Sequence, residues 1–259
     1  MISIVIRNRN EGVALEKILS ILTSVYSNDY NEIIIIDNNS IDNSIDIAKK
    51  FNCKIFNIDN FSYGRATNLG IEMSSSKYVL LLSSHSIPVG NSFFKNTISV
   101  LKNSNKIAGV RFINSIENYN RAVQNNFVIK EPLKYGLMTG CAIVNKEIWL
   151  DYKFNEELVF SEDKEWSQRV YDNGYEIIDM NETFFYFIKR DEKSSLRRIK
   201  NESIAKNLMY DMKPQSVTSL ICSFFLKILI TNNINYLKNL RYDFLLLNIK
   251  FEINKASKK

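Results

Sequence analysis

The feature that most constrains the fold is the run of four isoleucines over residues 33–36, which ends abruptly at Asp37. Consecutive β-branched residues predict a strand that is buried on both faces, as the strands of parallel sheets are. A second apolar run, Tyr78–Leu82, also ends in small polar residues. Open α/β sheets bind their ligands at the carboxyl ends of the strands. We therefore expect the functional residues to follow these two runs.

Between the expected strands, the spacing of apolar residues changes to that of helices. Leu15, Ile18, Leu19 and Leu22 lie on one face of a helix expected over residues 15–25. Another helix is expected from about residue 44 to residue 51, and a short strand over residues 54–58. Strands that alternate with helices predict βαβ units and a mostly parallel sheet with right-handed crossovers.

Composition sets the broad class of the protein. The chain has 259 residues, of which 45% are hydrophobic and 24% charged, which fits a globular domain with a large core and room for a tail. Cys53, Cys141 and Cys222 are scattered without metal-like spacing, so we expect reduced thiols in a cytoplasmic protein. A strand begins at once, and we expect no secretory signal. Nothing resembles a nucleic-acid-binding motif, so we expect no nucleic-acid partner.

The C-terminal part of the chain differs from the rest. Residues 189–259 are rich in Lys and Arg, and their longest apolar run, Val217–Ile230, is interrupted by Lys227. This run is shorter than the roughly 20 residues that a bilayer-spanning helix needs, so we do not expect it to span a membrane. We expect a catalytic domain over residues 1–210 and a helical extension over residues 211–259. Its mixture of apolar and basic residues favours an anionic membrane surface or a homodimer contact, and a helical hairpin packed on the catalytic domain is the alternative.

Five short motifs stand in a fixed order along residues 1–190. They are Arg7-Asn8-Arg9-Asn10-Glu11, Asp37 with Ser40 and Asp42, Arg65 with Asn68 and Gly70, Gly136-Leu137-Met138-Thr139-Gly140-Cys141, and Ser161-Glu162-Asp163. Together they resemble the inverting glycosyltransferases of family two. The resemblance implies a GT-A fold, which is an α/β fold with a Rossmann-like, mostly parallel central sheet flanked by helices, and it implies a helical C-terminal extension here.

The resemblance also implies roles for individual residues. Asp163 is the expected catalytic base, and Glu162 is expected to orient it. His85 is also expected to be catalytic, facing the ribose and diphosphate and supporting the leaving group. The expected nucleotide-binding residues are Arg7, Asn10, Glu11, Asp37, Ser40, Arg65, Asn68 and Ser83. The expected sugar or acceptor contacts are Gly140, Cys141 and Trp166.

One motif departs from the family. The metal-binding Asp-x-Asp falls on Ser83-Ser84-His85, so both aspartates are absent. His85, the one histidine of the chain, is then the remaining candidate metal ligand. Mg²⁺ prefers carboxylate oxygens, and Mn²⁺ tolerates imidazole better. We therefore do not expect a complete Mn²⁺ or Mg²⁺ site, and we expect no organic cofactor.

Simpler structural roles remain open for the main candidates. Asp37 caps a turn if it does not accept a hydrogen bond from the nucleotide base. Glu162 and Asp163 interact favourably with a helix N-terminus whether or not they are catalytic. Tryptophans are more often part of the core than of a sugar-binding surface, which applies to Trp166.

The predicted function is inverting transfer of a sugar from a nucleotide sugar, with a UDP-sugar favoured, to a hydroxyl of a saccharide or lipid-linked saccharide. The resemblance points to surface polysaccharide, capsule or lipopolysaccharide assembly in a bacterium, in the cytoplasm or on the inner face of the cytoplasmic membrane. A catalytically silent nucleotide-binding scaffold and a metal-independent CMP-sugar transferase are the alternatives. A nucleotidyltransferase is a third, but Gly12 stands alone where such an enzyme has a glycine-rich loop.

Overall fold

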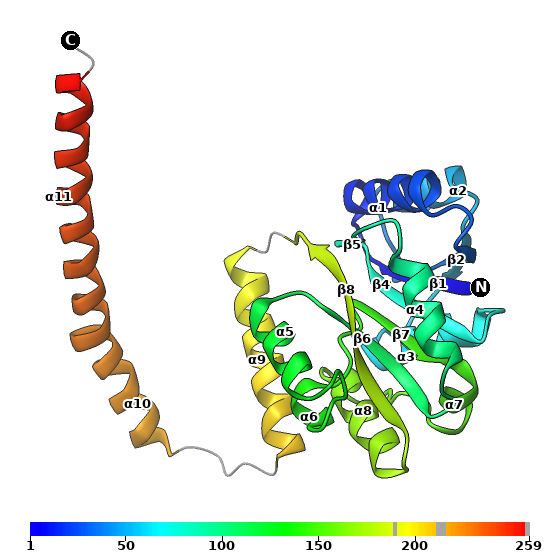
Figure 1. Ribbon diagram of the computed structural model, residues 1–259. Coiled ribbons are helices and arrows are strands. Elements are labelled where there is room, and N and C mark those ends of the chain that lie inside the picture. The colour runs from blue at the N-terminus through cyan, green and yellow to red at the C-terminus, as the bar shows by residue number, and fades with distance from the viewer. Residues whose placement is uncertain (189–190, 211–215, 257–259) are drawn as a thin grey trace. The chain divides into compact units, whose positions relative to one another are not determined.

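The computed structural model describes residues 1–188, 191–210 and 216–256. These residues divide into two units, Met1–Met209 and Tyr210–Lys259, and the division lies beside the expected boundary at residue 210. The first unit contains one curled sheet of eight strands with helices on both faces (Figure 1). The second unit is helical. This is the α/β architecture with a helical extension that the sequence predicts.

The sheet has the strand order β3-β2-β1-β4-β7-β6-β8-β5. The strands are β1 (Ile2–Asn8), β2 (Tyr30–Asp37), β3 (Lys54–Asn57), β4 (Tyr78–Ser83), β5 (Ser86–Pro88), β6 (Ile107–Ile113), β7 (Cys141–Asn145) and β8 (Glu176–Tyr186). The four strands from β3 to β4 are parallel, as expected. β7 is antiparallel to both of its neighbours, so its first residue lies at the same edge as the carboxyl ends of β1, β2 and β4.

Helices cover both faces of this sheet. They are α1 (Gly12–Val25), α2 (Ser44–Lys50), α3 (Tyr63–Met73), α4 (Phe93–Lys102), α5 (Ile116–Gln124), α6 (Pro132–Tyr135), α7 (Lys146–Asp151), α8 (Glu162–Asp172) and α9 (Glu192–Met209). The expected helices over residues 15–25 and about 44–51 are present as α1 and α2.

Alternate residues of the central strands enter two separate hydrophobic cores. Ile33 and Ile35 of β2 pack with α1 and α2, whereas Ile34 and Ile36 pack in the core that also holds residues of α3, α7 and α8. Residues 33–36 are each at most 6% exposed. The isoleucine run is therefore buried on both faces, as its composition predicts.

The second unit contains α10 (Val217–Leu226), a π-helical turn η1 (Lys227–Thr231) and α11 (Asn232–Ala256), which follow one another without a break. Residues Val217–Lys250 form a helix of 34 residues, and its most apolar 18-residue window has a mean hydropathy of 1.5. By length and composition this helix could cross a membrane, so the expectation that the region is too short and too polar does not hold. The apolar run ends at Ile230, but the helix continues beyond it to Lys250.

Candidate active site

The candidate active site lies at the carboxyl edge of the parallel strands. Register places Arg7 of β1 opposite Ser83 of β4, and Asn8 of β1 opposite Asp37 of β2. Ser83 donates its backbone N–H to the carbonyl of Gly140, just before β7 begins (2.9 Å). Three of the five sequence motifs therefore meet at one edge of the sheet, where open α/β sheets bind ligands.

The turn after β2 is closed by Asp37. Its Oδ1 accepts hydrogen bonds from Asn8 Nδ2 (2.9 Å) and Ser40 Oγ (2.6 Å), and its Oδ2 accepts one from Ser40 N (2.8 Å). Asn10 joins the same network, because its Oδ1 accepts from Ile41 N at 2.7 Å. Asp37 is only 1% exposed, so its carboxylate shapes the turn. Contact between Asp37, Ser40 or Asn10 and a nucleotide stays a prediction.

Asn68 of α3 is a buried junction rather than a surface group. Its Nδ2 donates to Phe154 O and Glu156 Oε1, and its Oδ1 accepts from Trp149 Nε1 and Phe154 N, all at 2.9 Å. These four bonds use the full capacity of the amide. Asn68 therefore ties α3 to the segment that precedes α8.

Arg65 lies one turn earlier on α3 and is 44% exposed. Its Nε pairs with Glu156 Oε2 (3.0 Å), and its NH1 donates to Asn60 O (3.0 Å). The hydrogen bond from Asn68 and the charge of Arg65 lower the pKa of Glu156 below its ordinary value. Glu156 is a residue that the sequence analysis missed, and only its place after Phe154 in the fold brings it to Arg65.

The consecutive carboxylates Glu162 and Asp163 begin α8 and are held by two neighbouring segments. Arg7 NH1 lies 3.4 Å from Glu162 Oε1, and Thr139 Oγ1 donates to the same oxygen at 3.3 Å. Thr139 also donates its backbone N–H to Asp163 Oδ2 (3.2 Å). Arg7, Thr139 and the Glu162–Asp163 pair, from three different motifs, are thus brought together as one cluster.

Burial dominates the electrostatics of this cluster. Burial, with a smaller contribution from the charge of Asp163, raises the pKa of Glu162 to about 7, against the lowering effect of Arg7. Burial also raises the pKa of Asp163, against the hydrogen bond from Thr139 N–H and the charges of Lys164 and Arg7. A carboxyl whose pKa lies closer to neutral pH than usual suits general acid–base catalysis.

The segment between α6 and β7 approaches α8 closely. A Cβ on Gly136 would lie 2.6 Å from the Cβ of Ser167, so only glycine fits there. Ser167 Oγ accepts from Leu137 N (2.9 Å) and donates to Asp163 O (2.6 Å). At Gly140, by contrast, an added Cβ would meet only ordinary contacts, with the nearest atom of Tyr186 at 3.8 Å.

Two of the expected sugar contacts need correction. Cys141 is fully buried in one hydrophobic core, where its register partner is Leu82. Trp166 is fully buried in the other core, stacked on Phe154 with ring centroids 4.9 Å apart, and its indole N–H donates to Tyr152 O. A side chain without exposed surface cannot contact a sugar, so both residues belong to the core.

His85 lies beside Glu11 at the same edge of the sheet. The distance from His85 Nε2 to Glu11 Oε1 is 3.2 Å, and the imidazole meets the ring of Phe187 edge-on with centroids 5.6 Å apart. His85 also donates its backbone N–H to Ser83 Oγ (3.3 Å). These contacts bring together three of the predicted site residues.

This donor set does not fit a resident divalent metal ion. Among the residues that the structure describes, no group of three or more His, Cys, Asp or Glu side chains could hold a metal ion. His85 and Glu11 offer one imidazole and one carboxylate, whereas Mg²⁺ and Mn²⁺ sites are usually octahedral and rich in oxygen ligands.

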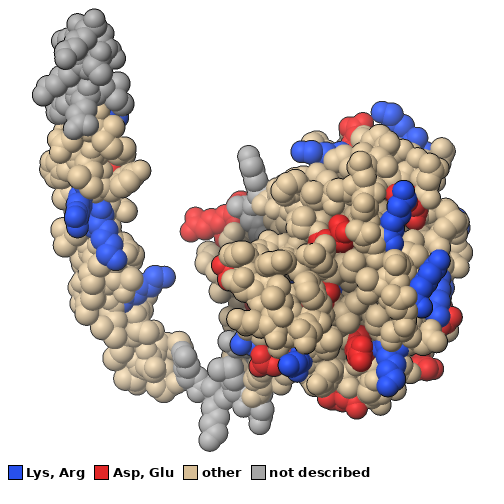
Figure 2. All heavy atoms as spheres, viewed as in Figure 1, with Lys and Arg blue, Asp and Glu red and all other residues tan. Residues whose placement is uncertain are grey.

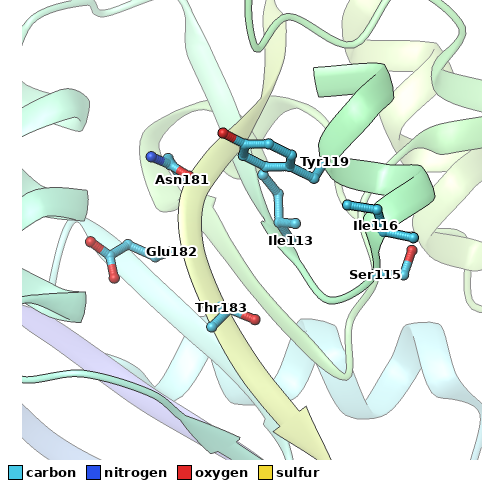
Figure 3. Close-up of a pocket in the computed structure, with 7 residues that line it drawn as sticks. All are labelled: Ile113, Ser115, Ile116, Tyr119, Asn181, Glu182 and Thr183. Atoms are coloured by element: carbon cyan, nitrogen blue, oxygen red, sulfur yellow. The ribbon is translucent and has the colours of Figure 1, made fainter. Parts of the chain in front are cut away.

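A shallow cavity of about 370 Å³ lies at the carboxyl end of β6 (Figure 3). It is lined by Ile113, Ser115, Ile116, Tyr119, Asn181, Glu182 and Thr183. The carboxylate of Glu182 points away from Tyr119 and Ile116, and it accepts a hydrogen bond from Asn96 Nδ2 (2.6 Å). The sequence analysis did not predict this cavity, because β6 and β8 are distant in the chain and no motif marks their pairing.

The fold is that of a GT-A glycosyltransferase. The model of the family "Glycosyl transferase family 2" matches residues 3–160, which is more than half of the chain. The chain therefore belongs to glycosyltransferase family 2, as the motifs predict. A comparison with curated protein sequences found no match.

Solved structures show the same fold at low sequence identity. The mannosyltransferase PcManGT from Pyrobaculum calidifontis, solved with GDP-Man and Mn²⁺, has a TM-score of 0.63 at 14% identity over 83% of this chain and 65% of its own. TarS residues 1–349 from S. aureus, solved with UDP-GlcNAc, has 0.57 at 16% identity over 74% of this chain and 60% of its own. Glucosyl-3-phosphoglycerate synthase from Mycobacterium tuberculosis, solved with Mn²⁺, UDP and glucosyl-3-phosphoglycerate, has 0.63 at 16% identity over 83% and 81%. The chain thus spans less than two thirds of the first two structures.

Proposed function

We propose that this protein transfers a sugar from a nucleotide sugar to an acceptor hydroxyl with inversion at the anomeric carbon. The observation that carries the proposal is the buried Glu162–Asp163 pair at the start of α8, held at the carboxyl edge of the sheet by Arg7 and Thr139. Asp163 is the general base, because its raised pKa brings it closer to the pH at which a base is most effective.

In the proposed reaction, Asp163 takes the proton from the acceptor hydroxyl while the hydroxyl oxygen attacks the anomeric carbon. The bond between that carbon and the phosphate oxygen breaks, and the electron pair leaves with the nucleoside diphosphate. Attack from the side opposite the leaving group inverts the configuration. Glu162 accepts a hydrogen bond from Thr139 Oγ1 and pairs with Arg7. Its role is therefore to orient the cluster, and it does not act as the base toward the acceptor hydroxyl.

The nucleotide end of the donor is assigned to the loops after β1 and β2 and to the start of α3. Arg65 is 44% exposed there, and a planar guanidinium suits a diphosphate or a base carbonyl. The structural neighbours were solved with GDP-Man, UDP-GlcNAc, UDP-Glc or UDP, so the fold accepts more than one nucleotide. We favour a UDP-sugar donor.

The negative charge that develops on the leaving diphosphate needs a positive or hydrogen-bonding partner. Two of the structural neighbours were solved with Mn²⁺, and in this chain the residues nearest to that role are Ser83 and His85 with Glu11. Two donor side chains do not form a metal site on their own. We propose that His85 supports the leaving group directly and that turnover survives removal of divalent ions.

The acceptor is assigned to the cavity between β6, α5 and β8. Thr183 lines this cavity, and Tyr186, three residues further along β8, lies against Gly140 beside Thr139. Asn114, next to the cavity, contacts Met138 through Nδ2 and Sδ (3.9 Å). Hydroxyl and amide groups next to the aromatic ring of Tyr119 suit a saccharide, since sugars present both hydroxyls and apolar C–H faces.

The helix over Val217–Lys250 suits a bilayer. Its most apolar 18-residue window is not buried at all within the protein, and the exposed side chains include three consecutive residues, Phe224, Phe225 and Leu226, which point to three sides of the helix. The surface of this helix carries few charged groups (Figure 2). Lys227, Lys238, Arg241 and Lys250 are interleaved with the apolar residues, and such cations favour anionic headgroups.

We therefore place the protein on the inner face of a bacterial cytoplasmic membrane, where a lipid-linked saccharide of surface polysaccharide or lipopolysaccharide assembly is the acceptor. Flotation of the full chain with anionic and with neutral liposomes tests this placement. We expect salt-sensitive binding to the anionic vesicles. Absence of binding, together with a dimer in solution, would contradict the membrane role and assign the helix to a contact between two copies.

A donor screen tests the proposed activity. UDP-, GDP- and CMP-sugars are incubated with the full chain, with and without EDTA, and release of the free nucleotide is measured. We expect turnover of one donor class that persists in EDTA and is lost in Asp163→Asn. Nucleotide binding without turnover of any donor would favour a silent scaffold, and turnover of a CMP-sugar alone would replace the favoured donor.

A further inference from the structure

Arg7 is expected from the sequence to bind the nucleotide, and its guanidinium makes hydrogen bonds with Thr67, Glu162 and Thr139. NH1 donates to Thr67 Oγ1 (3.1 Å) and lies 3.4 Å from Glu162 Oε1. NH2 donates to Thr139 O (3.3 Å) and Thr139 Oγ1 (3.1 Å). Both terminal nitrogens of the guanidinium are therefore occupied.

The surroundings of Arg7 fix its orientation. Its side chain is 15% exposed, and the carbon Cζ lies 5.2 Å from the centroid of the Tyr63 ring, a cation–π distance. Arg7 thus links four segments that are remote in sequence, which are β1, α3, the loop before β7 and the start of α8. A planar fork that meets acceptors on several sides holds them in one geometry, and a lysine cannot do this.

We infer that Arg7 is a positioning residue, which locks Thr139 and Glu162 in place and thereby holds the Asp163 carboxylate in its ionised, proton-accepting form. This inference rests on the proposed role of Asp163 as the base. It gives Arg7 a function in the reaction without direct contact with the nucleotide.

The charges around the carboxylate pair support this assignment. Arg7 reaches the pair from β1, Lys164 from α8 itself and Arg111 from β6, while α3 and the loop before β7 contribute the neutral Thr67 and Thr139. Arg7 lowers the pKa of both Glu162 and Asp163, and Lys164 lowers that of Asp163. Arg111 donates to the carbonyl of Tyr135 (2.6 Å). Arg7 is thus the cation in direct contact with the pair.

The test compares wild type with Arg7→Met and Arg7→Lys, and with Arg197→Met as the control. Arg197 is an exposed arginine of α9, outside the site. For each protein we measure donor turnover from pH 6 to pH 9 and the affinity for UDP by calorimetry. We expect Arg7→Met to lower turnover at pH 7 about tenfold or more. We also expect the acid limb of the pH profile, where turnover falls as the base becomes protonated, to move upward by about one pH unit. The reason is that a neighbouring cation favours the charged carboxylate, and the variant lacks this cation.

The same variants separate positioning from nucleotide binding. We expect the affinity for UDP to stay within about threefold of wild type in both Arg7 variants, and Arg197→Met to leave the acid limb unmoved. Arg7→Lys keeps the charge but loses the fork, so turnover falls with a smaller shift of the limb. A tenfold or greater loss of UDP affinity with an unmoved limb would overturn the inference, and Arg7→Lys decides this point if Arg7→Met does not fold.

A second measurement does not depend on turnover. The infrared band of protonated carboxyl groups is followed against pH, and the part that disappears in Asp163→Asn is assigned to Asp163. In Arg7→Met this part should persist to a higher pH than in wild type. If no donor is turned over but the band shifts, the proposed function fails while the role of Arg7 stands. An unshifted band contradicts the role of Arg7 itself.

Discussion

The raised pKa of Glu162 predicts that this buried carboxyl lowers the free energy of unfolding at neutral pH, and the variant Glu162→Gln measures by how much. Glu162 is 4% exposed, and burial raises its pKa from the ordinary value of 4.5 to about 7. Between these pH values the unfolded chain loses the proton first, so the folded state becomes less stable as the pH rises. Above about pH 7 the loss is complete and amounts to roughly 3 kcal/mol.

Glutamine has the shape of the protonated glutamic acid, and its Oε1 still accepts from Arg7 and Thr139, but it has no proton to lose. We therefore expect Glu162→Gln to gain stability over wild type from pH 5 to about pH 7, by about 1–3 kcal/mol in total, and the difference to stay level from there to pH 8.5. Turnover of the donor should fall in the same variant, because the charge that orients Arg7 is gone.

The assay is urea unfolding of the full chain at several pH values, with the free energy of unfolding taken from the linear extrapolation. The quantity of interest is the difference between variant and wild type, in which the titration of groups that do not interact with Glu162 cancels. Glu131→Gln, which changes an exposed glutamate outside the site, is the control. A difference that is flat with pH, or that falls as pH rises, would refute the burial argument for Glu162.

Two further substitutions test other parts of the site. Asn68→Ala should lower the free energy of unfolding by roughly 3–5 kcal/mol, since it leaves the buried Trp149 N–H and both backbone groups of Phe154 without partners. Urea unfolding measures this change. A loss below about 1 kcal/mol would contradict the proposed junction. His85→Ala should weaken UDP binding about tenfold in calorimetry, with or without Mn²⁺, if the imidazole meets the diphosphate. Unchanged affinity would limit His85 to its contacts with Glu11 and Phe187.

The parallel half of the sheet was predictable from sequence because its signals are local. The isoleucine run before Asp37 and the helical spacing of Leu15 to Leu22 each depend on neighbouring residues alone. The insertion of β7 between β4 and β6 was not predictable, since β7 pairs with strands distant in sequence and a short buried strand shows no direction in its residues.

The site shows the same division between local and remote signals. The meeting of Asp37, Ser40 and Asn10 follows from the adjacency of β1 and β2, which the sequence predicts. The contact between Arg7 and Glu162 joins residues 155 positions apart, and no local sequence pattern predicts it. Trp166 was expected among the sugar contacts, with a core position as the alternative, and its helix turns it into the core.

The extent of the C-terminal helix was misjudged for a related reason. A count of consecutive apolar residues stops at Ile230, whereas the helix continues to Lys250 and its hydropathy is averaged over polar residues as well. Hydropathy averaged over a helical length, rather than run length, is the quantity that a bilayer responds to.

The most direct test of the central claim is the turnover ratio of wild type and Asp163→Asn at matched nucleotide occupancy. An amide at this position keeps the shape of the carboxylate but cannot take the proton of the acceptor. With UDP affinity unchanged, we expect the variant to lose roughly a hundredfold to ten-thousandfold in donor turnover. Retention of more than about a tenth of the wild-type turnover would show that another group is the base and would contradict the account.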